Sequence, residues 1–137
     1  MDPIFTHRLE VRFRDCDPLG HANNAVYLTY LEQARFAHWR ALGHASVEAG
    51  APGVILAHAD IDYRQPARYG DALEVRIGLV NIGRTSFTYE YEILSSAGGL
   101  VASARTVLVM YDYAASRPVP VPDELRAILP VPVASEP

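Results

Sequence analysis

The side chains best suited to chemistry lie close together near the N-terminus, between residues 15 and 24. This stretch holds two carboxylates, one imidazole and two side-chain amides, contributed by Asp15, Asp17, His21, Asn23 and Asn24. A carboxylate can attack an acyl carbonyl carbon or activate a water molecule to do so. Backbone amides at a helix N-terminus can stabilise the oxyanion that forms. The stretch therefore offers the groups that thioester hydrolysis needs, although Asp and Asn are also favoured turn and capping residues.

The elements on either side of this stretch must position it. Residues 8–14 alternate between polar and apolar side chains, which predicts a half-buried strand. From about residue 25 the spacing is helical, with Asn23 or Asn24 as the expected N-cap and Gly43 in the place of a C-cap. The predicted apolar face comprises Tyr27, Tyr30, Leu31, Ala34, Ala37, His38 and Ala41, and the opposite, polar face comprises Thr29, Glu32, Gln33, Arg35 and Arg40.

The rest of the chain predicts strands. Alternating apolar residues favour strands at 55–63, 73–79, 87–93 and 100–111, joined by short turns as hairpins of an antiparallel meander. A short helix is expected at 123–129. The predicted fold is α+β, with a five-stranded antiparallel sheet wrapped around one long central helix. Because one helix covers only one face of such a sheet, we expect the chain to form oligomers.

Composition narrows the class of protein. The chain has 137 residues and a net charge of −4, which gives no reason to expect binding to nucleic acid or to an anionic membrane. No apolar stretch approaches the length needed to span a bilayer, and the N-terminus lacks a signal-peptide pattern. The single cysteine, Cys16, rules out an internal disulfide and fits a reducing compartment. We therefore expect a cytoplasmic protein.

Four segments together resemble one known family. Residues 14–35 carry the pattern Arg-Asp-x-Asp-x-x-Gly-His-x-Asn-Asn-x-x-Tyr-Leu-x-Tyr-x-Glu-x-Ala-Arg. With residues 62–71, 83–87 and 121–125, this pattern resembles the 4-hydroxybenzoyl-CoA thioesterase-like branch of the hotdog superfamily, and most closely its bacterial acyl-CoA thioesterases with the Gly-His-x-Asn-Asn form. The resemblance spans nearly the whole chain. It implies a single hotdog domain over residues 1–137, of which 130–137 are expected to be a flexible tail.

The resemblance also implies an activity and a site. It implies hydrolysis of acyl-CoA thioesters to a free carboxylic acid and coenzyme A, with no cofactor beyond the coenzyme A of the substrate. In this family pattern, Asp17 takes the place of the catalytic carboxylate, which acts as nucleophile or general base. The amide of Asn24 at the helix N-terminus takes the place of the group that polarises the thioester carbonyl. His21 takes the place of a residue that assists the reaction. The site is expected at a subunit interface of a homodimer or homotetramer. Expected substrate contacts are Asn23, Tyr27, Tyr63, Arg64, Arg84, Thr85 and Ser86.

Several of these residues also have structural interpretations. Asp15 is expected to brace the loop by pairing with Arg12 or Arg14, and Cys16 to be a packed thiol, because flanking carboxylates disfavour a thiolate. A metal site at Asp15, Asp17 and His21 is rejected, because no second shell is evident. The acyl group is expected along the helix, against Tyr27, Tyr30 and Tyr63.

Two other functions compete with hydrolysis. Phosphatases with an Asp-x-Asp loop need a parallel sheet, which the predicted hairpins exclude. A hotdog protein that binds acyl-CoA or acyl-carrier protein without turnover remains the alternative. The sequence does not decide the length or aromatic character of the acyl group.

Overall fold

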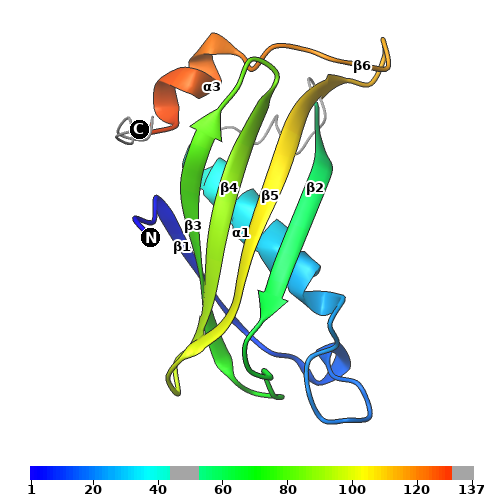
Figure 1. Ribbon diagram of the computed structural model, residues 1–137, viewed down its shortest axis with the longest axis vertical. Helices are drawn as coiled ribbons and strands as arrows, with labels where there is room; N and C mark the ends of the chain where they lie inside the picture. The colour runs from blue at the N-terminus through cyan, green and yellow to red at the C-terminus, as the bar shows by residue number, and fades with distance from the viewer. Residues whose placement is uncertain (44–52, 131–137) are drawn as a thin grey trace.

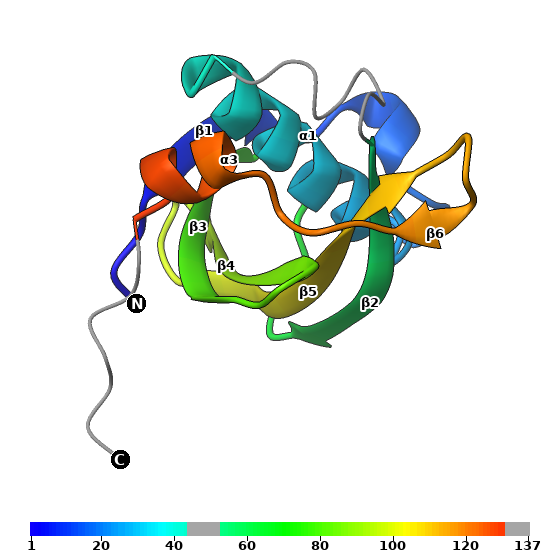
Figure 2. The same cartoon turned by 90° about the horizontal axis from the view of Figure 1, so that it is seen from above.

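An antiparallel sheet curls around one long helix in the computed structural model (Figures 1 and 2), which describes residues 1–43 and 53–130. The elements are β1 (Phe5–Glu10), a 3-10 helix (Phe13–Asp15), α1 (Val26–Ala41), β2 (Gly53–Tyr63), β3 (Ala72–Ile82), β4 (Ser86–Ser95), β5 (Leu100–Asp112), β6 (Arg117–Pro118) and α3 (Asp123–Ile128). The predicted α+β class and the central helix are confirmed. All but Pro130 of the expected flexible tail lies outside the described residues.

The strand order is β1-β3-β4-β5-β2, and the two-residue β6 pairs with β5. The sheet thus has the five predicted strands and a short sixth that was not predicted. The hairpins β3–β4 and β4–β5 are confirmed, but the predicted hairpin between β2 and β3 is wrong, because β2 pairs with β5 and β3 with β1. The intervening turn bonds to the end of β1 instead: Val11 N–H donates to the carbonyl of Asp71, and Gly70 N–H donates to that of Val11.

The core lies between the sheet and one face of α1. Inward-facing residues of β3, β4 and β5 are buried, among them Val75, Ile77, Phe87, Tyr89, Tyr91 and Leu108. The prediction for Arg35 was wrong, because it is buried and its guanidinium donates to the Tyr91 hydroxyl at 3.2 Å. Arg35 lies one turn beyond Leu31, on the face that meets the sheet. Ala41, predicted on that face, is exposed.

The ends of the elements before the sheet also differ from prediction. The first strand stops at Glu10, and Phe13–Asp15 form a 3-10 helix because the Asp15 carboxylate accepts the backbone N–H of Arg12 at 2.9 Å. The N-cap residue of α1 is Ala25, and not Asn23 or Asn24 as predicted. The Asn23 side-chain oxygen instead accepts the N–H of Ala25 itself. The expected role of Gly43 is confirmed, since it follows the helix with φ of +80°.

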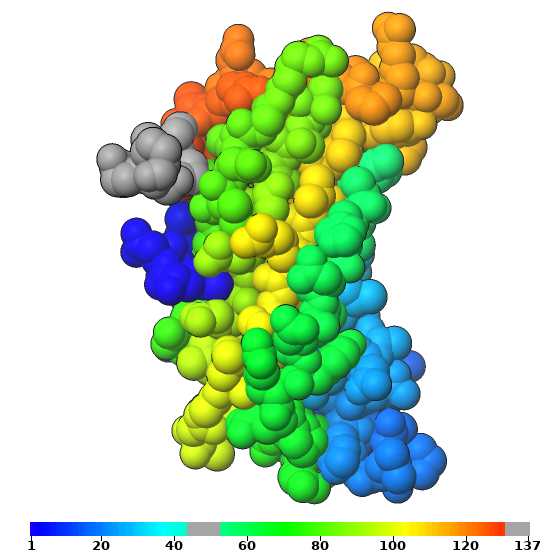
Figure 3. Space-filling view, in the orientation of Figure 1, coloured from blue at the N-terminus to red at the C-terminus, as the bar shows by residue number. Residues whose placement is uncertain are grey.

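No helix of the described residues lies across the outer face of the sheet. Figure 3 shows β3, β4, β5 and β2 side by side on this face, while α1 lies behind them in Figure 1. β2 forms one edge of the sheet, because its single partner strand is β5. Among the described residues, no helix has the length and apolar character needed to cross a membrane.

Candidate active site

Asp17 lies at the start of a tight turn that precedes α1. Asp17 N–H donates to the His21 carbonyl at 3.0 Å, and Gly20 N–H donates back to the Asp17 carbonyl at 2.9 Å. Gly20 has φ of +86°, a left-handed conformation that a residue with a Cβ adopts only at a cost. The Asp17 carboxylate accepts the N–H of Leu19 at 2.9 Å through Oδ1. This bond orients the carboxylate while the side chain stays half-exposed.

The turn is fixed from both sides by backbone bonds. Ala22 N–H donates to the Ala67 carbonyl at 2.7 Å, and Asn23 N–H donates to the Asp15 carbonyl at 2.8 Å. The Tyr27 hydroxyl, buried on α1, accepts the N–H of Ala67 at 3.3 Å. Residues far apart in sequence therefore hold the turn in place, so the position of Asp17 depends on the folded chain.

Asp15 is the buried carboxylate of the pair and has a structural role. Its side chain is 2% exposed, and it accepts hydrogen bonds from the Arg12 guanidinium at 2.9 Å and the Tyr30 hydroxyl at 2.8 Å. Burial alone would raise the pKa of the Asp15 carboxyl, but the bonds from Arg12 and Tyr30 outweigh it and lower that pKa. The predicted pairing of Asp15 with Arg12 is confirmed. Of the two loop carboxylates, Asp17 is the one left open to a substrate.

Cys16, between the two carboxylates, is half-buried, and its thiol lies 3.7 Å from the Arg12 carbonyl. Its partial burial agrees with the expected packed thiol. No three His, Cys, Asp or Glu side chains of the described residues gather as metal ligands. His58, on β2, pairs with Asp60 at 3.1 Å.

Asn24 lies just before α1 and is exposed. Its backbone carbonyl accepts a hydrogen bond from the Tyr63 hydroxyl at 3.0 Å. Within the described part of the chain, no hydrogen bond uses its backbone N–H. A free amide at this end of a helix suits a developing negative charge. The amide can therefore act as a donor to a substrate oxygen.

Two hollows flank the turn. One, of about 310 Å³, is lined by His21, Ala22, Asn24, Tyr27, Tyr63, Arg64, Gln65 and Pro66. The other, of about 440 Å³, is lined by Phe13, Arg14, Cys16, Asp17, Pro18, Gly20 and Tyr69. The two hollows share no lining residue: Asp17 lines the larger one, and Asn24 lines the smaller one.

The remaining expected substrate contacts lie in different places. Tyr27, Tyr63 and Arg64 line the hollow of Asn24, and Arg64 also lies 4.0 Å from the Asp62 carboxylate. Tyr30 is buried and uses its hydroxyl on Asp15, and it lines neither hollow. Asn23 is exposed and uses its side-chain oxygen on Ala25.

Arg84, Thr85 and Ser86 form the β3–β4 turn, at the opposite end of the sheet from the Asp17 turn (Figure 1). The backbone carbonyls of Arg84 and Gly83 accept the Arg126 guanidinium at 3.2 and 2.6 Å, which ties this turn to α3. Within one chain, the structure does not bring this turn to Asp17.

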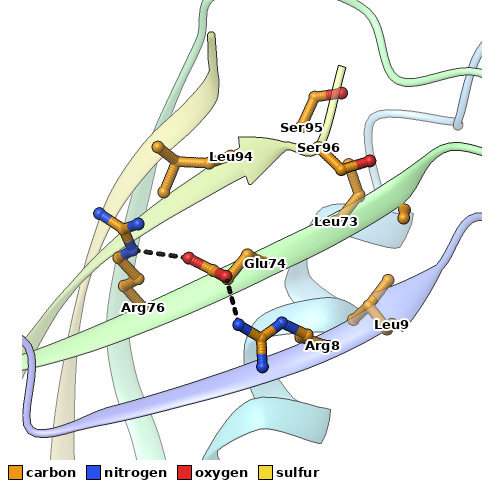
Figure 4. A pocket seen from close by; sticks show the side chains of 9 residues that line it. Arg8, Leu9, Leu73, Glu74, Arg76, Leu94, Ser95 and Ser96 are labelled. Atoms are coloured by element: carbon orange, nitrogen blue, oxygen red, sulfur yellow. Dashed lines mark hydrogen bonds and ion pairs between the residues drawn. The ribbon is translucent and has the colours of Figure 1, made fainter. Parts of the chain in front are cut away.

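A third hollow, of about 290 Å³, contains none of the expected site residues. It lies over β1, β3 and the end of β4, where Glu74 pairs with Arg8 at 3.1 Å and Arg76 at 2.8 Å (Figure 4). Because two guanidiniums share one carboxylate, the charged side chains that line this hollow carry a net charge of +1, and both guanidiniums are already bound to Glu74.

Sequence reasoning missed two residues beside Asp17. The alternating pattern places Phe13 in a strand, and Tyr69 falls in a simple turn, yet both line the hollow of Asp17. Tyr69 gave a signal, because large apolar side chains are unusual in exposed turns, whereas Phe13 gave none, because the alternation assigned it to a strand.

The chain is similar to known proteins in sequence and in fold. The model of the family described as "Thioesterase-like superfamily" matches residues 11–129. The chain is 30% identical over 120 residues to the 1,4-dihydroxy-2-naphthoyl-CoA hydrolase of Synechococcus elongatus, covering 85% of this chain and 88% of the relative. It superposes on the PA2801 protein of Pseudomonas aeruginosa with a TM-score of 0.85 and 29% identity, covering 92% and 98% of the two chains. A thioesterase of Thermus thermophilus, complexed with coenzyme A and Zn, gives a TM-score of 0.81 and 35% identity, covering 92% and 97%.

Proposed function

The chain belongs to the thioesterase-like superfamily, and from this premise we propose that it hydrolyses acyl-CoA thioesters to a free carboxylic acid and coenzyme A. The observation that carries the proposal for its site is the contrast between the two loop carboxylates. Asp15 is buried and fully engaged, whereas Asp17 is half-exposed, held by one backbone bond, and lines the largest of the hollows described above.

In the proposed reaction, Asp17 either attacks the thioester carbonyl carbon or takes a proton from the water that attacks it. Both routes form a tetrahedral intermediate whose oxygen carries negative charge, and its collapse breaks the carbon–sulfur bond. In the general-base route, the proton that Asp17 took from water passes to the leaving thiolate, and the free acid leaves. In the nucleophilic route, the thiolate is protonated from solvent, and the acyl group stays on Asp17 as a mixed anhydride until water hydrolyses it to the free acid and restores the carboxylate. The Oδ1 bond to Leu19 leaves Oδ2 available for this step. Asp15 takes no part in this step, because its carboxylate already accepts hydrogen bonds from Arg12 and Tyr30.

The Asn24 amide is proposed to donate a hydrogen bond to the carbonyl oxygen. It lies at the start of α1, where the helix dipole also favours negative charge. The Tyr63 hydroxyl donates to the backbone carbonyl of Asn24 and so helps to orient Asn24. His21 lines the same hollow and is proposed to assist through a hydrogen bond to the substrate. Asn23, Tyr27 and Arg64 are proposed as neighbouring substrate contacts.

We also propose that the active form is a homodimer or homotetramer with the site at the subunit interface. The unpaired edge of β2 can accept a second β2 in antiparallel pairing. A twofold axis at that edge would bring the far end of the partner's sheet, with Arg84, Thr85 and Ser86, to the end that carries Asp17. Those residues could then contact the coenzyme A moiety. The cytoplasm is the proposed location.

The test is release of free thiol from benzoyl-CoA, hexanoyl-CoA and palmitoyl-CoA by the wild-type chain and by Asp17→Asn. We expect wild-type turnover on at least one substrate and a loss in kcat of at least about 100-fold in Asp17→Asn. Asp15→Asn is not a suitable control, because Asp15 stabilises the fold. Glu10→Gln, an exposed carboxylate at the end of β1, is the matched control and should keep full activity.

Two results would contradict the proposal. Full activity in Asp17→Asn would remove Asp17 from the reaction. Binding of acyl-CoA by the wild-type chain, without turnover of any of the three substrates, would favour the non-catalytic binding function instead.

A further inference from the structure

Two aromatic side chains are exposed beside Asp17. Phe13 is 79% exposed and Tyr69 is 65% exposed, and their rings meet edge to face, with centroids 5.8 Å apart and an interplanar angle of 84°. They come from segments more than fifty residues apart in the sequence. Exposed rings of this size leave apolar surface in water, which is unfavourable unless a ligand or a partner covers them.

Both rings are carried by rigid turns. Phe13 opens the 3-10 helix that the Arg12–Asp15 pair closes, with an ion-pair distance of 2.9 Å. Tyr69 lies in the turn where Asp71 accepts the Arg68 N–H at 2.8 Å and Gly70 donates to the end of β1 at 3.0 Å. The backbone positions that carry the two rings are therefore fixed before any ligand arrives, which lowers the entropic cost of binding against them.

The same two rings line the hollow that contains Asp17. Its volume of about 440 Å³ lies within the range of small-molecule pockets. Pro18 and Gly20 line it as well, and Arg14 is its one cationic residue. The neighbouring hollow is lined by Asn24, Tyr63 and Arg64 among others.

We propose that the acyl group enters the hollow of Asp17, and that Phe13 and Tyr69 make this site select a flat aromatic acyl group over a straight alkyl chain. The inference rests on the proposed thioester hydrolysis. An aromatic acyl group gains an offset or edge-to-face contact with the paired rings, beyond the area that it buries. An alkyl chain of equal size buries similar area without this ring–ring contact. The thiol end then lies toward Arg64, whose positive charge suits the phosphates of coenzyme A.

The experiment removes the rings and keeps their apolar bulk, through Phe13→Leu and Tyr69→Leu. The ratio of kcat/KM for benzoyl-CoA to that for hexanoyl-CoA is compared with wild type. Since a ring–ring contact is worth about 0.5–1.5 kcal/mol, each substitution should lower the ratio about 2- to 10-fold, chiefly through benzoyl-CoA. Tyr113→Leu is the matched control: Tyr113 is 54% exposed and lies just after β5, toward the other end of the sheet, and the ratio should not change.

The dissociation constants of both substrates are also measured on Asp17→Asn, alone and combined with Phe13→Leu. This binding measurement tests the aromatic preference even if the wild-type chain shows no turnover. An absence of turnover would overturn the proposed hydrolysis, but it would leave the aromatic preference standing. An unchanged ratio in both Leu variants, by kinetics and by binding, overturns the inference while the hydrolysis stands. An equal loss on both substrates, accompanied by a change in oligomeric state, overturns it in favour of a second copy that covers the rings.

Discussion

The Asp15 carboxylate and the Tyr30 hydroxyl join the loop before α1 to the buried face of that helix, through a hydrogen bond of 2.8 Å. Burial and the neighbouring carboxylate both raise the pKa of the Tyr30 phenol, so it stays protonated and remains a donor. The carbonyl of Asp15 in turn accepts the N–H of Asn23. The two residues therefore link helix packing to the position of the candidate site.

Tyr30→Phe is expected to lower the free energy of unfolding by about 1.5–3 kcal/mol, because it removes a donor to a buried carboxylate. Urea unfolding at pH 7 measures the change. Tyr113→Phe is the matched control, because its hydroxyl donates to the Val54 carbonyl from an exposed position, and it should cost less than about 0.5 kcal/mol. Equal losses of unfolding free energy in the two variants would mean that the hydrogen bond from Tyr30 to Asp15 stabilises the fold no more than the exposed bond of Tyr113.

His38 makes stability depend on pH. It is buried between Phe5 and Tyr89, and its Nε2 has no hydrogen-bond partner within residues 1–43 and 53–130. Burial lowers the pKa of its imidazole to about 4. In the unfolded chain the imidazole takes up a proton near pH 6.5, whereas in the folded chain it does so near pH 4. The unfolded state thus binds more protons between these values, and stability falls as the pH drops from about 6.5 toward 4.

From pH 7 to pH 5 this difference corresponds to about 2 kcal/mol of lost unfolding free energy. His38→Phe should flatten the dependence, measured by urea unfolding at both pH values. Burial also lowers the pKa of His7, so His7→Gln serves as the comparison and should remove a smaller part of the slope. A His38→Phe variant with the wild-type slope would assign the pH dependence to other groups.

Gly20 and Gly43 allow the effect of backbone strain to be separated from the effect on activity. Both have positive φ, +86° and +80°, and, apart from the adjoining residues, an added Cβ would meet no atom of the described part of the chain within 4 Å at either position. Gly20→Ala and Gly43→Ala should each cost about 1 kcal/mol of stability. Since Gly20 closes the turn that orients Asp17, only Gly20→Ala should also lower kcat, by about 10-fold. Thiol release and urea unfolding are measured for both variants. Equal kcat values in the two variants would argue against a role of the Gly20 turn in orienting Asp17.

Much of the local structure could be predicted from the sequence. The alternation of β3, β4 and β5 and the helical spacing of α1 report which side of each element is apolar, and this depends on near neighbours alone. The family pattern between Arg14 and Arg35 also marked the loop. The burial of Arg35 was missed, because a charged residue at the edge of an apolar stripe is usually solvated.

The sequence by itself determined the α+β class, the central helix and the carboxylates available for chemistry. Only the tertiary structure decided the neighbours of β1 and β2, since β1 pairs with β3, and β2 pairs with β5 at the far edge and not with β3. It also distinguished the two carboxylates, by burying Asp15 against Tyr30 and leaving Asp17 open. It brought Phe13 and Tyr69 together beside Asp17. These outcomes depend on contacts between residues distant in sequence, which no local pattern encodes.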